Sequence, residues 1–131
     1  MAASVSLCRT GVLCLLCLAV WTAPVLAREV PPPAYQLAAH DAGIPSAVLY
    51  AVALQESGIA LRGRRTPWPW TLNVAGQARR FQTREAACAN LRRALREMPA
   101  TRIDVGLGQI NVGYQAHRFD HPCELLDPYR N

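Results

Sequence analysis

The sequence contains no lysine, so all 14 of its basic residues are arginines. A phosphate-binding P-loop requires a lysine, and the glycine spacing of dinucleotide-binding loops is also absent, which excludes both kinds of nucleotide site. Biased genomic base composition explains the arginines more simply than selection for an arginine surface. Acidic residues number only nine, and the resulting positive charge suits an anionic polymer such as cell wall or nucleic acid.

Long apolar runs are also lacking, since a membrane-spanning helix needs about 20 apolar residues. The run from Gly11 to Val20 follows Arg9 and leads to a small-residue ending at Ala27. This order predicts a secretory signal peptide over residues 1–27, cleaved after Ala27, rather than a membrane anchor. We therefore expect an exported, periplasmic protein, and export makes the cell wall a better candidate partner than nucleic acid.

Cysteine is scarce once the signal peptide is removed. Three of the five cysteines leave with it, and Cys88 and Cys123 remain. An even pair in an oxidising compartment favours a disulfide, although Cys88 also falls on an apolar helix face that suits a free, buried thiol. No cysteine spacing resembles a metal site and the histidines are scattered, so we expect no metal and no cofactor.

Residues 28–131 have the length of one small domain with a modest core. Without Arg9, its 13 arginines exceed the nine acidic residues and give a formal charge of +4. Residues 28–33 predict an extended leader, and residues 34–131 predict an α+β domain that is mainly helical with a small β-hairpin. The expected elements are helices over Ala34–Asp41 and Pro45–Ser57, a polar loop at Arg62–Arg65, strands over Trp70–Val74 and Arg79–Gln82, a helix between Thr83 and Pro99 with Cys88, Leu91, Leu95 and Met98 on its buried face, and a helical segment over Val112–Phe119.

A carboxylate occupies the last place on an apolar helical stripe. Leu49, Val52, Ala53 and Glu56 stand at positions i, i+3, i+4 and i+7, which share one face of a helix. Burial there, and the partial negative charge at the helix C-terminus, would both favour the neutral carboxylic acid that a general acid requires. The alternative interpretation is a glutamate paired with a nearby arginine at the helix end.

The stretch from Gly106 to Asn111 combines glycines with amides. Gly106 and Gly108 allow a backbone to approach a ligand closely or to bend tightly. Gln109 and Asn111 both donate and accept hydrogen bonds, which matches the hydroxyl and acetamido groups of a sugar. A plain turn with polar ends is the alternative interpretation.

Taken together, the two segments resemble the lytic transglycosylase family, which has the lysozyme-like fold. In that family a Glu-Ser pair ends a helix, as in Gln55–Gly58, and a Gly-Leu-x-Gln-Ile-Asn stretch lines the sugar cleft, as in Gly106–Asn111. Pro67–Val74 and Asp104-Val105 look like the branch carried by conjugative elements and by secretion or pilus systems. The resemblance covers residues 34–131.

The resemblance implies cleavage of the β-1,4 bond between MurNAc and GlcNAc in peptidoglycan, with Glu56 as the acid/base. Trp68 and Trp70 could stack on sugars, but they fit a packed hairpin core at least as well. The residues that the resemblance places against the substrate are Ser57, which would orient the Glu56 carboxylate or the sugar, together with Gly108, Gln109, Asn111 and Tyr114.

A single carboxylate suffices for the mechanism that the family implies. Most glycosidases use two, whereas a lytic transglycosylase lets the C6 hydroxyl of the muramic acid attack the anomeric carbon. Glu56 would protonate the leaving oxygen and then accept the hydroxyl proton, giving 1,6-anhydro-MurNAc. Among the other acids only Asp104 lies beside a site motif, and we interpret it as structural.

Two features differ from the family pattern. Gly108 stands where many members carry Met, which predicts a more open cleft wall. Members also continue beyond a segment like Asp127–Asn131 into further helices, so the resemblance implies a domain that is incomplete at its C-terminal end. The alternative functions are a lysozyme-type hydrolase and a non-catalytic peptidoglycan-binding or assembly module of a conjugation or secretion apparatus.

Overall fold

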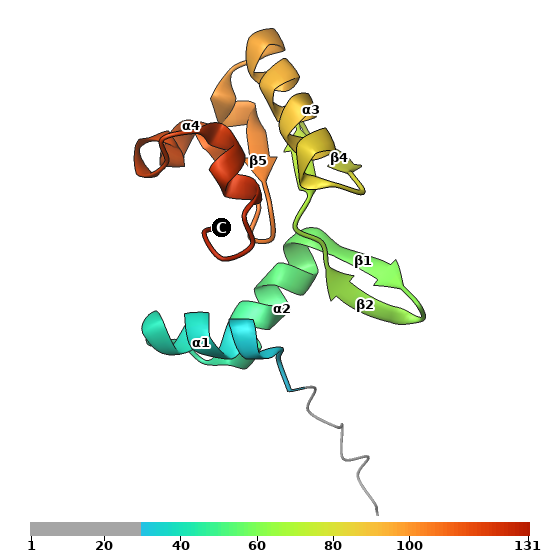
Figure 1. The fold of residues 1–131 in the computed structure, drawn as a ribbon, viewed down its shortest axis with the longest axis vertical. Helices are drawn as coiled ribbons and strands as arrows, with labels where there is room; N and C mark the ends of the chain where they lie inside the picture. The colour runs from blue at the N-terminus through green and yellow to red at the C-terminus, as the bar shows by residue number, and fades with distance from the viewer. Residues whose placement is uncertain (1–29) are drawn as a thin grey trace, which may run out of the picture.

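The computed structural model describes residues 30–131, and the predicted signal peptide lies outside the described residues. The fold is mixed α+β (Figure 1). Its helices are α1 (Pro33–Asp41), α2 (Ser46–Ser57), α3 (Arg84–Glu97) and α4 (Val112–Gln115), with 3₁₀ helices η1 (Ala100–Arg102), η2 (Ala116–Arg118) and η3 (Pro122–Leu126). Its strands are β1 (Gly58–Leu61), β2 (Arg64–Pro67), β3 (Thr71–Val74), β4 (Gln77–Arg80), β5 (Ile103–Val105) and β6 (Ile110–Asn111).

The N-terminal part of the fold consists of α1, α2 and the antiparallel hairpin β1–β2, in the lower half of Figure 1. The sequence predicts the two helices, but it predicts a loop where the hairpin stands. Leu61 pairs with Arg64, so Arg62 and Gly63 form a two-residue turn with φ values of 49° and 75°. Such turns need positive φ at both positions and are usually marked by Asn-Gly or Asp-Gly. The arginine at the first position therefore conceals the turn from sequence inspection.

α1 and α2 are bent by 114° relative to each other. Within residues 30–131, no single helix is both long and apolar enough to cross a membrane, and only this bent pair reaches the necessary length and hydropathy when its two helices are taken together.

The C-terminal part is built on a four-stranded antiparallel sheet in the order β4-β3-β5-β6. Val74 pairs with Gln77, so the turn predicted after Val74 is confirmed, and β4 begins at Gln77 rather than at Arg79. β5 and β6 have three and two residues. Strands this short carry almost no alternation, which explains why the sequence does not indicate them.

α3 begins at the predicted cap, because the Thr83 side-chain oxygen accepts a hydrogen bond from the Ala86 backbone N–H at 3.2 Å. The centre of its buried face differs from the prediction. Leu91 is buried as expected, but Cys88 and Leu95 lie at the edge of the core. The fully buried positions are Ala87, Leu91 and Ala94, because small alanines allow the helix to approach the sheet closely.

A disulfide joins Cys88 of α3 to Cys123 of η3, across a sequence separation of 35 residues. The predicted pairing is thereby confirmed, and the alternative of a free thiol at position 88 is wrong. The bond fixes η3 against α3, which the Arg84 guanidinium reinforces by donating to the Cys123 carbonyl oxygen at 3.0 Å.

The hydrophobic core lies in the C-terminal part. In contrast, Leu37 of α1 and Val48 and Val52 of α2 are exposed. The N-terminal helices are therefore held by fewer apolar contacts than the sheet. The core consists of Leu72, Val74, Ala87, Leu91, Ala94, Ile103, Val105, Val112, Cys123, Leu125 and Leu126, whereas α1 and α2 bury only Ala39, Tyr50, Ala53 and Ser57.

The contact between α1 and α2 predicts a loss of stability in alkali. Tyr35 meets Tyr50 edge to face with ring centroids 5.0 Å apart. Burial, reinforced by Tyr50, raises the pKa of Tyr35 from 10.0 to about 12. The folded state therefore retains a proton that the unfolded chain releases near pH 10, so this stability is present below pH 10 and is lost as the pH rises towards 12.

We expect Tyr35→Phe to reduce the alkaline fall in unfolding free energy, measured by urea titration across this range. Tyr129→Phe is the matched control because Tyr129 is exposed, and an equal alkaline fall in both variants would contradict the prediction.

Candidate functional site

Glu56 lies in the last turn of α2 and is exposed. The predicted burial of this side chain is wrong, because Val52 on the same stripe is 46% exposed and Leu49 is only half-buried. α2 instead turns a neighbouring face inward, the one that carries Tyr50, Ala53 and Ser57. No ion pair to Glu56 is present among residues 30–131, so the alternative of an arginine partner is not realised there either. The carboxylate is thus open to a ligand.

Ser57, the neighbour of Glu56, is completely buried. Its hydroxyl donates to the Ala53 carbonyl oxygen within the helix at 2.8 Å. The side chain therefore has no surface from which to contact a sugar, which leaves the orientation of Glu56 as the remaining part of its predicted role. Its effect on Glu56 is indirect, because it fixes the last turn of the helix from which the glutamate projects.

Arg65 brings a positive charge to the end of α2, a contact that the sequence does not indicate. A Cβ added to Gly58 would lie 2.7 Å from Arg65 Nε and would also overlap the Leu54 carbonyl oxygen. Gly58 has an ordinary φ of −61°, so the position needs glycine for space and not for a left-handed backbone. A cation beside a helix C-terminus is favourable, and here it adjoins the turn that carries Glu56.

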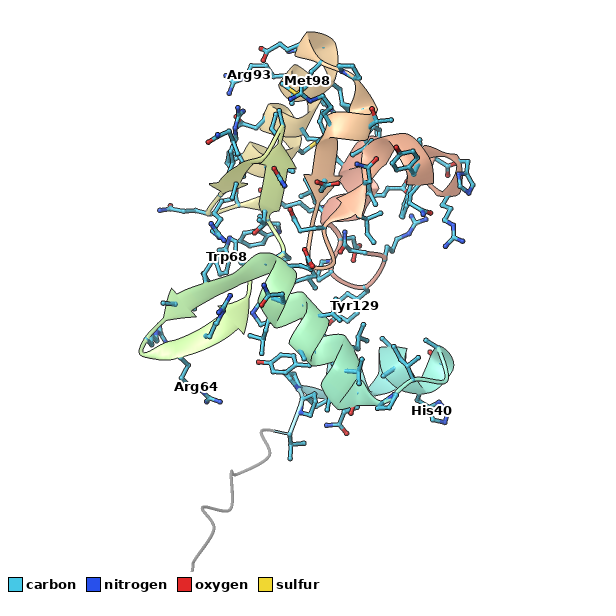
Figure 2. The ribbon with its side chains drawn as sticks, turned by 180° about the vertical axis from the view of Figure 1, so that it is seen from behind. His40, Arg64, Trp68, Arg93, Met98 and Tyr129 are labelled. Atoms are coloured by element: carbon cyan, nitrogen blue, oxygen red, sulfur yellow. A yellow bond between two sulfur atoms is a disulfide. The ribbon has the colours of Figure 1, made fainter. Side chains whose placement is uncertain are left out.

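A series of hydrogen bonds connects the end of α2 to the glycine-containing turn. The Trp68 N–H donates to the Ser57 carbonyl oxygen at 3.1 Å, and the Trp68 carbonyl oxygen accepts from the Thr71 hydroxyl at 2.8 Å. The carbonyl oxygen of the buried Thr71 in turn accepts from the Gly106 N–H at 2.9 Å and from Gln109 Nε2 at 3.4 Å. Figure 2 shows Trp68 at the junction between the hairpin β1–β2 and the sheet. The two motifs singled out in the sequence are thus joined through Trp68 and Thr71.

Gln109 has a left-handed backbone, with φ of 48°. Such a conformation is uncommon for a residue other than glycine and is often found at functional sites. Its Nε2 donates to the Gly106 carbonyl oxygen at 2.8 Å and to Thr71. Both bonds use the donor side of the amide, so within residues 30–131 Oε1 accepts no hydrogen bond from the protein and can accept one from a ligand.

Asn111 is occupied by bonds within the fold. Its Oδ1 caps α4 by accepting from the N–H groups of Gly113 and Tyr114 at 3.1 and 3.3 Å. Its Nδ2 donates to Asp104 Oδ1 at 2.8 Å and to the Thr101 carbonyl oxygen at 3.0 Å. Both hydrogens of the amide are used, so Asn111 orients α4 rather than presenting a free donor to a sugar. The structural interpretation of Asp104 is supported by the same contact.

Asn131 closes the glycine turn and is not predicted from the sequence. Its carboxamide accepts from the Gly108 N–H and donates to the Val105 carbonyl oxygen, across 23 and 26 positions of the chain. A Cβ on Gly106 would overlap this carboxamide. The close approach inferred for the glycines is therefore made to a side chain of the same chain, and local sequence carries no signal for such distant contacts.

The aromatic residues differ in their accessibility. Trp68 and Trp70 form an edge-to-face pair with centroids 5.3 Å apart, and Trp68 Nε1 donates to the Phe81 carbonyl oxygen at 2.7 Å. These contacts favour the packing interpretation of the two tryptophans. Tyr114 on α4 is 69% exposed, so its ring is accessible from solvent.

Two hollows in the described surface are lined neither by Glu56 nor by the Gly106–Asn111 stretch. One of about 280 Å³ adjoins the disulfide, and the other, of about 240 Å³, lies between α4 and η3. Within residues 30–131, no group of three or more His, Cys, Asp and Glu side chains could hold a metal ion. The arrangement that remains for chemistry is an exposed carboxylate at the end of α2, where the backbone is joined by hydrogen bonds through Trp68 and Thr71 to an amide-bearing turn. Comparisons of the chain with models of protein families, with curated proteins and with solved structures found no match.

Proposed function

We propose that this protein is a peptidoglycan lytic transglycosylase with a lysozyme-like fold and Glu56 as its only acid/base. One observation carries the proposal: hydrogen bonds through Trp68 and Thr71 link the helix end that bears Glu56 to the Gly106–Gln109 turn. An acid at a helix end and an amide-bearing turn are the two elements that a glycan-cleaving site of this kind requires.

In the proposed reaction, Glu56 donates its proton to the glycosidic oxygen as the bond between that oxygen and C1 of MurNAc breaks. The C6 hydroxyl of the same MurNAc forms the new bond to C1, and the Glu56 carboxylate takes the hydroxyl proton. The products are a 1,6-anhydro-MurNAc end and a GlcNAc end, and the enzyme recovers its original protonation state. This mechanism needs no second carboxylate. Asp104 is therefore not required for the chemistry, and its carboxylate accepts a hydrogen bond from Asn111.

Because Glu56 is exposed in the free protein, the bound substrate must itself cover this carboxylate. A glycan strand lying over the end of α2 would exclude water from Glu56 and so strengthen its hydrogen bond to the glycosidic oxygen. Substrate binding would then supply the desolvation that the fold does not provide.

The other site residues take roles that follow from their contacts. Gln109 Oε1 accepts a hydrogen bond from the sugar, because its Nε2 is already held by the turn. The exposed ring of Tyr114 offers a stacking face. Ser57 and Asn111 act through the backbone that they fix, and Gly108 leaves the turn open.

Export by a signal peptide over residues 1–27 would place the enzyme in the periplasm beside its substrate. The excess of arginine over acidic residues suits the anionic wall polymer. Opening the wall locally for a conjugation or secretion apparatus is the biological setting that fits such an enzyme.

Digestion of purified peptidoglycan, followed by mass spectrometry of the soluble fragments, tests the proposal. We expect fragments ending in 1,6-anhydro-MurNAc, each lighter by one water than its hydrolytic counterpart. Fragments with reducing ends alone would replace the proposal with a lysozyme-type hydrolase. Binding to peptidoglycan without any soluble fragment would replace it with a non-catalytic wall-binding module.

A further inference from the structure

The carboxamide of Asn131 uses three hydrogen bonds to join three separate stretches of chain. Its Nδ2 donates to the Val105 carbonyl oxygen at 2.8 Å and to the Leu125 carbonyl oxygen at 2.7 Å. Its Oδ1 accepts from the Gly108 N–H at 2.7 Å. Both donors of the amide are used together with its acceptor, so the end of β5, the glycine turn and η3 meet at this one side chain.

The Asn131 carboxamide fits here because residue 106 is a glycine and has no side chain. Gly106 is buried and has φ of 84°, a conformation that side chains disfavour. A Cβ there would also overlap the Asn131 carboxamide and the Leu125 carbonyl oxygen. Backbone geometry and space therefore both require glycine, and the Asn131 side chain fills the volume that glycine leaves.

The segment that delivers Asn131 is itself tied down. The Asp127 carbonyl oxygen accepts from the N–H groups of Arg130 and Asn131 at 3.1 and 3.0 Å. Arg130 forms an ion pair with Glu124 at 2.6 Å and lies over the Phe119 ring at 5.7 Å. Asn131 thus approaches the glycine turn from a fixed direction.

The Thr71 carbonyl oxygen holds the two ends of the Gly106–Gln109 turn, whereas the Gly108 N–H at its middle bonds to Asn131. The backbone of the turn contributes one long hydrogen bond, from the Gln109 N–H to the Gly106 carbonyl oxygen at 3.4 Å. Gln109 must also retain a left-handed backbone. The Gly106 carbonyl oxygen orients the Gln109 amide, so a shift of this turn moves the group that meets the sugar.

We propose that Asn131 is a positioning residue that holds the Gly106–Gln109 turn, and through it the Gln109 amide, in the sugar-binding conformation. The expected effect of Asn131 on glycan cleavage rests on the proposed function. Its expected effect on the shape of the turn does not. Asn131 acts through Gln109 and the Gly108 N–H and takes no part in the chemistry at Glu56.

The structural consequence is measured by amide hydrogen exchange, followed by NMR, on the full protein and its Asn131→Ala and Asn131→Asp variants. The Asp variant keeps the shape but loses both donors, and its carboxylate faces the Val105 and Leu125 carbonyl oxygens. We expect exchange of the Gly108 amide to accelerate at least tenfold in both variants, while the core amide of Leu72 keeps its rate. Asn90→Ala is the matched control, because the Asn90 carboxamide forms its hydrogen bonds with Ala86 and Arg93 inside α3. An unchanged Gly108 rate, or equal acceleration at Leu72, would overturn the inference.

The catalytic consequence is measured on soluble glycan strands freed of their peptides. We expect both Asn131 variants to raise KM at least fivefold with kcat within twofold, because sugar binding weakens while Glu56 is unaffected. A purely structural role would lower the active fraction, and therefore the apparent kcat, at unchanged KM, which would contradict the inference. If the wild-type protein cleaves no glycan, the proposed function fails, and the Gly108 exchange rate alone decides whether Asn131 holds the turn.

Discussion

Replacing Glu56 by Gln is expected to lower the rate of glycan cleavage by about 10²- to 10⁴-fold, the usual contribution of a general acid/base. Glutamine keeps the size and polarity of the side chain but can neither release nor accept the catalytic proton. Glu56 is exposed and has no ion pair among residues 30–131, so we expect the free energy of unfolding to change by less than about 0.5 kcal/mol. The two measurements are release of soluble anhydro fragments and urea unfolding.

Glu97→Gln serves as the matched control for this substitution, because Glu97 is an exposed glutamate in the last turn of α3. It should cleave at the wild-type rate. Retention of activity in Glu56→Gln would remove Glu56 from the chemistry. A comparable loss in Glu97→Gln would indicate that the effect comes from surface charge instead.

Removing the disulfide by the paired substitution Cys88→Ala and Cys123→Ala is expected to destabilise the fold by about 3–4 kcal/mol. The bond closes a loop of 35 residues, and restricting an unfolded loop of this length contributes on that order. The effect should be large for this protein because the bond connects α3 to η3, whose Leu125 and Leu126 belong to the core. Urea unfolding of the oxidised wild type and the paired variant measures the difference.

The wild type under reducing conditions provides the control for lost side-chain packing, since it lacks the bond but retains both sulfurs. We expect it to lose most of the same stability. A fully stable reduced protein would show that packing alone secures η3 and that the disulfide contributes little.

The fold could be predicted where its determinants are local. Periodic apolar residues and the Thr83 cap located the helices, and the Ala75-Gly76 turn located the hairpin of β3 and β4. The hairpin β1–β2 was missed because its turn is built on an arginine with positive φ. The inward face of α2 was also misassigned. Which stripe is buried depends on where α1 and β2 pack, and an apolar sequence such as that of α2 offers more than one stripe.

The candidate site could be predicted as a pair of motifs but not as a set of contacts. The order of Glu56 and the Gly106–Asn111 stretch along the chain is sequence information, whereas the inward turn of the Gln109 amide depends on Thr71, which is 38 positions away. The hydrogen bond from Asn111 to Asp104 likewise depends on the tertiary structure. Side-chain hydrogen bonds of this range are decided only when the strands have paired.

The one-sided distribution of the core has a consequence for where the molecule opens first. Segments with few apolar contacts undergo local unfolding at lower free energy than a packed sheet. Here α1 and α2 bury four side chains between them, and the acid stands at the end of that pair. Thermal fluctuations would thus displace Glu56 before they disturb the Gly106–Gln109 turn, so the proposed activity would be lost on heating at a temperature below that at which the sheet melts.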